Sequence, residues 1–333
     1  MNLKPRLIKV LIAGLCAVFF PVIQSPVVNA ATCSSYSVGY QGPLTGPEAG
    51  LGTSQLNAMK FALTKFKAAN SSPMLSSTVA TADDQGDPTF SSNAAQSLIN
   101  DPCVIAVVGP AYSGAGKVAL PMYLAAGMPI ITPSATNESL SKIGGSTFHR
   151  SARLQKDTNL DIMRDIATVS PEATVAYFYN GKAYSPNLLP SGFSGITVTS
   201  GPLFPESRAE NAISIKAAYD AGARYFLYDG QIDRQNIQDF AQDVKALSSA
   251  NRIIFSGEIN PLDVKEFYTT SMNGSWFYPS TLSFSLLNST LGSDFATAYP
   301  ASSKTFVTEA FDAAYFFFQA IAAGADTRGK VNT

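Results

Sequence analysis

Hydrophobic and polar positions along the chain follow two alternating patterns. Short β-branched runs such as residues 104–108, Val-Ile-Ala-Val-Val, carry no charge, which is typical of strands buried on both faces. Between such runs lie longer segments with apolar residues at helical spacing, for example Leu56, Met59, Leu63 and Phe66. This alternation predicts an α/β protein built from βαβ units on parallel sheets.

The predicted elements fall into two sets. The expected strands span residues 36–40, 77–82, 104–108, 129–132, 174–179, 197–199, 225–228, 252–255 and 276–278. The expected helices span residues 89–99, 115–126, 154–169, 210–220, 236–247 and 262–268, besides one that Thr53 or Ser54 would cap. The second set begins after residues 148–150, so the sequence predicts two domains.

The first 30 residues have the features of a secretory signal. Lys4, Arg6 and Lys9 precede an apolar stretch at residues 10–23, which as a helix would span about 21 Å, short of the roughly 30 Å hydrocarbon layer. Small or slim residues at positions 28 and 30, after the apolar stretch, predict cleavage after Ala30. We therefore expect an exported protein, in the periplasm or on the extracellular side of the cell surface. Cys16 lacks a small residue directly before it, which disfavours lipidation.

Two cysteines remain once the leader is removed. Cys33 and Cys103 form an even pair in an oxidising compartment and each precedes a predicted strand, which favours a disulfide bond. The alternative is two free buried thiols.

Composition narrows the range of functions. Only 14% of residues are charged and the net charge is -1, so no basic field is available for nucleic acid. One histidine and three cysteines are few for imidazole or thiolate chemistry. The segment 111–115 lacks the glycines of a nucleophile elbow, and Lys117 is followed by Val118 where a phosphate loop needs Ser or Thr. We predict no enzymatic activity, no cofactor and no metal site.

Five stretches, each at the expected carboxyl end of a strand or beside one, carry a resemblance. They are residues 42–46 (GPLTG), 83–88 (DDQGDP), 108–113 (VGPAYS), 130–140 (IITPSATNESL) and 148–150 (FHR). In this order they resemble the type I periplasmic solute-binding proteins of the branched-chain amino-acid and amide ABC transporter group. The likeness is dense over residues 36–157 and thinner to about Ala323.

The resemblance implies a fold and its division into domains. It implies two doubly wound parallel-sheet lobes with a ligand cleft between them. The first lobe would comprise residues 31–152 and 280–333, and the second residues 153–279. Members of the group usually continue beyond the helix that ends near Ala323, whereas this sequence stops at Thr333. We therefore expect either a shortened lineage or a fragment.

The resemblance also implies a function. The protein would capture a small amino acid, or a related amide or carboxylate, by lobe closure and deliver it to the membrane permease of an ABC transporter. The alternative is a ligand-sensing receptor module that uses the same cleft to regulate a partner.

The site residues are implied by the same resemblance. It assigns Thr136 and the backbone at Ser134 to the polar end of the ligand, Glu258 to its ammonium group and Tyr184 to the far side of the cleft. Gly114 stands where a serine is usual, so a carboxylate donor would fall to its backbone N–H or to Ser113. The complete set of expected ligand-binding residues is Ser113, Gly114, Ser134, Ala135, Thr136, Tyr184, Gln231 and Glu258. Leu51 and Gln231 occupy places that are often aromatic.

Each assignment has a structural alternative. Thr136 could be a turn or cap residue, Glu258 a solvated acid or a cap for a helix opening at Pro261, and Tyr184 a packing residue.

Other polar residues are given structural roles. Asp83, Asp84 and Asp87 resemble a hard-cation cluster, but exposed acids at a strand end are commoner and Asp87 precedes Pro88 as at a helix start. His149 is expected to be a structural hydrogen-bonding residue.

Overall fold

The computed structural model describes residues 33–179, 196–200, 207–230 and 233–332. The expected cleavage site after Ala30 and the expected site residues Tyr184 and Gln231 lie outside these ranges. No helix within the described ranges is long and apolar enough to cross a membrane.

The first half of the chain forms a five-stranded parallel sheet. Its strands are β1 (Ser37–Gly42), β2 (Ala80–Asp83), β3 (Val104–Val108), β4 (Ile130–Thr132) and β5 (Phe148–Arg150). Their order in the sheet is β2-β1-β3-β4-β5, and every pairing is parallel. The uncharged run at β3 is fully buried between β1 and β4, as its sequence predicts.

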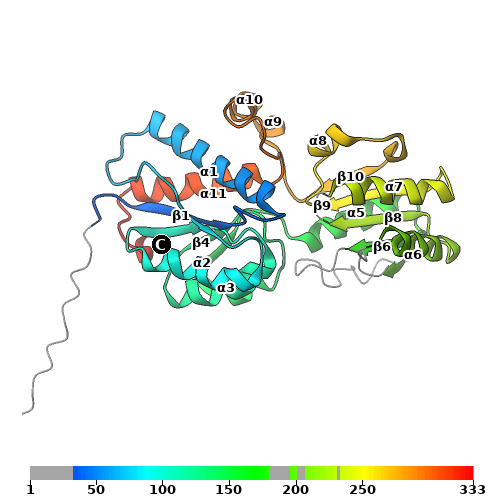
Figure 1. Ribbon diagram of the computed structural model, residues 1–333, viewed down its shortest axis with the longest axis horizontal. Helices are drawn as coiled ribbons and strands as arrows, with labels where there is room; N and C mark the ends of the chain where they lie inside the picture. The colour runs from blue at the N-terminus through cyan, green and yellow to red at the C-terminus, as the bar shows by residue number, and fades with distance from the viewer. Residues whose placement is uncertain (1–32, 180–195, 201–206, 231–232, 333) are drawn as a thin grey trace, which may run out of the picture. The chain divides into compact units, whose positions relative to one another are not determined.

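Helices cover both faces of this sheet. One face carries α1 (Ala49–Ala69) and α11 (Val307–Ala322), which share an apolar core with β1 and β3. The other face carries α2 (Pro88–Asn100) and α3 (Ser113–Ala125), with a second core that includes Leu98, Leu120 and Tyr123. Figure 1 shows α11, which is red, beside α1, which is blue, although nearly 240 positions separate them in the sequence. Helix α11 therefore completes a sheet whose strands all come from the first half of the chain.

The second half forms another five-stranded parallel sheet. Its strands are β6 (Thr174–Tyr179), β7 (Thr197–Ser200), β8 (Tyr225–Gly230), β9 (Arg252–Gly257) and β10 (Trp276–Pro279), in the order β10-β9-β8-β6-β7. Helices α6 (Arg208–Asp220) and α7 (Arg234–Leu247) pack on one face through a core that contains Phe226, Phe240 and Phe255. Helix α5 (Gln155–Val169) packs on the other through Ile162 and Ile166. Two doubly wound parallel sheets are the expected fold class.

Short elements connect these layers. They are α4 (Leu140–Ile143), α8 (Pro261–Val264), α9 (Phe284–Leu287), α10 (Ser289–Ala298), α12 (Arg328–Val331) and 3₁₀ turns at Gly145–Thr147, Lys265–Phe267 and Thr270–Met272.

The chain passes between the two sheets in two places. Residues 151–154 lead from β5 to α5, and residues 280–283 lead from β10 to α9. Gln155, which directly follows the first passage, contacts the second, because its Oε1 accepts a hydrogen bond from the Ser280 hydroxyl at 2.9 Å. Its Nε2 donates to Ser256 Oγ of β9 at 2.9 Å. The expected lobe boundaries, after residue 152 and before residue 280, fall within these passages. As a division into domains they stay a prediction.

The expected disulfide is present and most helix starts are where the sequence placed them. Cys33 and Cys103 are bonded, with their Cα atoms 5.6 Å apart. Asp87 caps α2 by accepting a hydrogen bond from the Thr89 N–H at 2.7 Å, with Pro88 in the first turn.

Two expected helix boundaries were wrong. Helix α1 begins at Ala49, before Thr53 and Ser54, because Gly52 lets the first turn form close to Pro43 of the preceding loop. Ser54 Oγ donates to the carbonyl of Gly50 inside the helix instead of capping it. The helix expected at 262–268 ends as α-helix at Val264 and continues as a 3₁₀ turn.

Candidate ligand-binding site

A pocket of about 560 Å³ lies where loops of both sheets meet. Its lining comes from the loop before α1 and the start of α1, the N-cap of α3, the first residue of α7, the residue after β9, α8 and the 3₁₀ turn that follows it, and the segment 300–305 between α10 and α11. The lining residues are Pro47, Glu48, Gly50, Leu51, Tyr112, Arg234, Glu258, Asp263, Glu266, Phe267, Pro300, Ala301, Ser302, Ser303, Lys304 and Thr305. Ligands of open α/β sheets bind at this position, outside the carboxyl ends of parallel strands.

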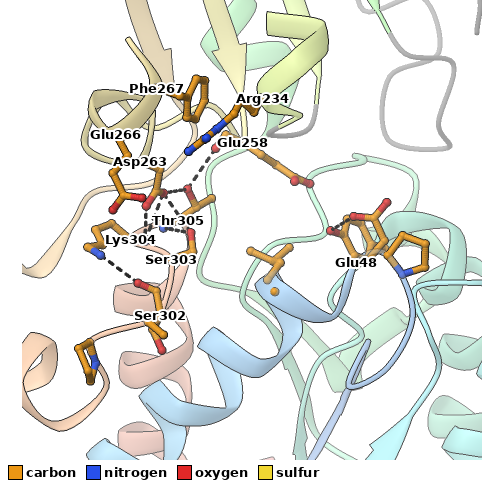
Figure 2. Close-up of a pocket in the computed structure, with 16 residues that line it drawn as sticks. Glu48, Arg234, Glu258, Asp263, Glu266, Phe267, Ser302, Ser303, Lys304 and Thr305 are labelled. Carbon is orange, nitrogen blue, oxygen red and sulfur yellow. Dashed lines mark hydrogen bonds between the residues drawn. The ribbon is translucent and has the colours of Figure 1, made fainter.

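The segment 300–305 links helices that follow different sheets. The Ser303 N–H donates to Ser54 Oγ of α1 at 2.9 Å, while the Ser303 hydroxyl donates to Asp263 Oδ2 of α8 at 3.0 Å. The Lys304 N–H donates to Asp263 Oδ1 at 2.9 Å, and Thr305 Oγ1 lies 2.8 Å from Asp263 Oδ2. Figure 2 shows these bonds converging on Asp263. The Asp263 carboxylate therefore serves to fix this wall of the pocket.

Two further carboxylates influence the buried side chain of Tyr112, one by a hydrogen bond and both by their charge. Glu48 precedes α1 and Glu258 follows β9. The buried Tyr112 hydroxyl donates to Glu48 Oε2 at 3.0 Å. Burial raises the pKa of Tyr112 well above its usual value, and the charges of Glu258 and Glu48 raise it further. In Figure 2 the Glu258 side chain extends to the side of the pocket where Glu48 lies.

Two basic residues line other parts of the pocket. The Arg234 guanidinium lies 5.2 Å from the centre of the Phe267 ring, a geometry that holds it by cation–π attraction. The Lys304 ammonium donates to the carbonyl of Ser302 at 3.0 Å. Both cations therefore have contacts with the wall of the pocket.

The expected site residues are divided between the pocket and the interior. Glu258 lines the pocket, as does Leu51. Ser113, Gly114, Ser134, Ala135 and Thr136 are clustered at the N-terminus of α3 and after β4, and all but Gly114 are buried. They do not belong to the pocket lining, although Tyr112, directly before Ser113, does. Tyr184 and Gln231 lie outside the described residues.

The two serine hydroxyls of this interior cluster already have protein partners. Ser134 Oγ donates to the carbonyl of Ala111 at 2.6 Å and accepts from Gln55 Nε2 at 2.8 Å. Ser113 Oγ accepts from the Asn137 N–H at 3.2 Å. The assignment of these residues to a ligand stays a prediction.

Two of the structural alternatives can be assessed. The helix that opens at Pro261 is capped by Asn260, whose Oδ1 accepts from the Leu262 N–H at 2.9 Å, so Glu258 is not its cap. The N-cap of α4 is Ser139, so Thr136 does not cap that helix.

The three acids near β2 have structural contacts. Asp84 is buried and accepts hydrogen bonds from Gln41 Nε2 and the Gly86 N–H, while burial raises its pKa. For Asp83, partial burial acts to raise the pKa, but hydrogen bonds from Thr45, Leu44 and Gln85 bring it below its usual value. Within the described ranges, no group of three His, Cys, Asp or Glu side chains is arranged to hold a metal ion. His149 is exposed on β5.

The sequence did not single out several lining residues as ligand-binding candidates. Arg234 and Asp263 each follow a strand of the second sheet, so the strand-end rule could have indicated them. Glu48 ends a Gly-Pro-rich loop after β1 and could have been found in the same way. Residues 300–305 follow a helix, and no local signal marks them as part of a pocket.

Comparison with known proteins gives a family match for the first half of the chain. Residues 35–188 match the family model described as periplasmic binding protein. A search of curated proteins gives no match.

Solved structures share the fold along most of the chain. A leucine binding protein, LivK, from Thermotoga maritima is 15% identical with a TM-score of 0.73, over 89% of this chain and 86% of that one. The LivJ substrate-binding protein of Streptococcus pneumoniae, in complex with isoleucine, is 18% identical with a TM-score of 0.72, over 90% and 86%.

A third structure has a different kind of ligand. A solute binding protein of an ABC transporter from Rhodopseudomonas palustris, in complex with 3,4-dihydroxy benzoic acid, is 18% identical with a TM-score of 0.71, over 90% of this chain and 84% of that one. The shared fold therefore does not fix the ligand. The resemblance read from the sequence is confirmed: the protein has the fold of a type I periplasmic binding protein, and its residues 35–188 match that family.

Proposed function

We propose that the protein is the exported substrate-binding component of an ABC transporter. It captures a small solute that carries an amino group, such as an amino acid, and presents it to a membrane permease. The observation that carries this proposal is the pocket of about 560 Å³ at the strand ends, with a carboxylate, Glu258, in its wall.

The pocket suits capture by closure. Its lining includes residues that follow strands of the second sheet, such as Glu258, and residues at the start of α1 beside the first sheet, such as Leu51. A solute that contacts both groups favours the conformation in which they are close together. A permease that recognises this conformation would then accept only the loaded protein.

Glu258 is the proposed partner of the ammonium group. It lies directly after β9, at the edge where Gly257 adopts a positive φ of 79° and turns the chain. Charge-assisted hydrogen bonds of this kind are shorter and stronger than neutral ones. Binding in the micromolar range, about -8 kcal/mol, is enough for scavenging a nutrient.

Isothermal titration of the exported protein against amino acids, amides and small carboxylates tests the proposal. We expect binding by at least one amine-bearing solute, and about a tenfold loss of its affinity in Glu258→Gln. Glu172→Gln is the matched control, because Glu172 is exposed and precedes β6, at the sheet edge opposite the strand ends. Heat from none of the solutes would refute the function, and unchanged affinity in Glu258→Gln would refute the role of Glu258.

A further inference from the structure

The charges around the pocket are unequal. Four acids line it, Glu48, Glu258, Asp263 and Glu266, against the two bases Arg234 and Lys304. The cavity and the fold mark this place as the ligand site, and its charge then bears on the kind of ligand. A solute that enters it meets a negative balance of two charges.

The four acids lie on two sides of the pocket, with Asp263 and Glu266 on one side and Glu48 on the other (Figure 2). Asp263 accepts hydrogen bonds from the hydroxyls of Ser303 and Thr305 and from the Lys304 N–H, so it serves to fix the wall. Glu48 and Glu258 come from different parts of the fold: Glu48 accepts a hydrogen bond from the Tyr112 hydroxyl at 3.0 Å, and the Glu258 side chain extends toward the side of the pocket where Glu48 lies (Figure 2). Their carboxylates are therefore two centres of negative charge on the same side of the pocket.

Each class of small solute fits this arrangement differently. A neutral zwitterion places one ammonium against one carboxylate and brings its own carboxylate toward the other, which weakens the attraction. A dicarboxylate is repelled by both. A solute with two amino groups neutralises both acids, and Leu51 and Pro47, which lie near Glu48 in the sequence, offer apolar surface for the methylene groups between the amino groups.

We propose that the solute carries a net positive charge, with two amino groups on a short methylene chain that are held by Glu258 and Glu48. This inference rests on the proposed function, because it takes the same pocket as the transport site. The shared chemistry is the pair of amino groups, which occurs with a carboxylate in a basic amino acid and without one in a linear diamine. Glu48 is then the residue that determines specificity for charge.

Titration of the exported protein with four probes tests the inference: L-lysine, cadaverine, L-leucine and L-glutamate. We expect lysine or cadaverine to bind at least about tenfold more tightly than leucine, with glutamate weakest. The comparison of lysine with cadaverine then shows whether the solute also has a carboxylate. Raising the salt concentration should weaken the dicationic probe more than leucine.

A substitution at Glu48 tests whether this residue causes the selectivity for charge. Glu48→Gln should reduce affinity for the better dicationic probe by about tenfold and should not reduce affinity for leucine, because the charge removed is the one that repels the leucine carboxylate, while Glu172→Gln changes neither. Selectivity of the unaltered protein among the four probes is measured first, so the test holds even where Glu48→Gln fails to fold.

The results of these titrations distinguish a failure of the dicationic ligand from a failure of the proposed binding function. Leucine or glutamate binding as tightly as both dicationic probes would overturn the inference and leave the function standing. A folded Glu48→Gln protein that keeps full affinity for the dicationic probe would also overturn it. Absence of binding by all four probes, and by the wider panel of amines and carboxylates, would overturn both.

Discussion

Gly52 is the residue that fixes how close helix α1 comes to the loop before it. A Cβ atom added at Gly52 would lie 1.8 Å from the carbonyl oxygen of Pro43. Gly52→Ala therefore requires the backbone of one segment to shift, and we expect a loss of roughly 1–3 kcal/mol in the free energy of unfolding. Urea denaturation of the ligand-free protein, followed by circular dichroism, measures it.

Gly50 is the matched control at the residue scale. It lies two residues earlier in the same helix, and a Cβ added there would meet no atom within 4 Å. Gly50→Ala should be neutral or stabilising by up to about 1 kcal/mol, since alanine favours helix more than glycine does. Equal stability of the two variants would show that the contact with Pro43 does not constrain α1.

Helix α11 shows how one element completes a layer that begins far away in sequence. Its Phe311 ring lies 5.3 Å from Phe284 and 5.9 Å from Phe61, measured between ring centres. These rings belong to α11, α9 and α1, so a single aromatic cluster ties the returning chain to the first sheet. Phe311→Ala should lower the free energy of unfolding by about 3–5 kcal/mol, because a large ring is lost from a packed core.

Phe316 provides the comparison within the same helix. Its side chain is 56% exposed, whereas Phe311 is 8% exposed. Phe316→Ala should change the free energy of unfolding by no more than about 0.5 kcal/mol. Similar losses in both variants, measured by chemical denaturation, would contradict the packing of α11 on α1.

At the scale of the whole molecule, Glu309 connects the two passages between the sheets. Its Oε2 accepts from the Thr281 hydroxyl at 2.8 Å and its Oε1 from the Leu282 N–H at 3.2 Å, while its carbonyl accepts from the Ser151 hydroxyl at 3.1 Å. Burial raises the pKa of Glu309 to about 7, and the hydrogen bonds that favour the carboxylate only partly offset this. Between pH 4.5 and about pH 7, the Glu309 carboxyl group is therefore protonated in the folded protein and ionised in the unfolded chain.

The sign of the pH dependence follows from this difference. Because the folded pKa is raised, the contribution of Glu309 to stability is fully present below the unfolded value of 4.5 and is lost as pH rises through about 7. The loss amounts to roughly 3 kcal/mol. Glu309→Gln should remove this part of the pH dependence between pH 5 and pH 7.

Unfolding curves at several pH values measure the effect as the difference between the two proteins. The difference isolates Glu309 from other carboxyl groups whose pKa is raised, such as Asp84. Parallel pH profiles for the wild type and Glu309→Gln would show that this carboxyl group does not titrate in the expected range.

Local patterns were enough to predict the layers of the fold. The β-branched run at β3 and the apolar spacing of α1 depend on which faces of each element are buried, and that periodicity is written in adjacent residues. The Cys33–Cys103 bond was predictable for a similar reason, since both cysteines precede strands of one parallel sheet. Boundaries were less predictable, as at Ala49, because the close approach of Gly52 to Pro43 is a contact between segments.

The sequence by itself determined the parallel α/β architecture, the resemblance to a binding-protein family and the place of Glu258 after a strand. Only the tertiary structure decided that Glu48, Asp263 and Thr305 line the pocket with it, and that Ser113 and Ser134 have partners inside the protein. The reason is physical: periodicity reports which side of an element is buried. A pocket, in contrast, is formed where loops distant in sequence are brought together by the packing of whole elements.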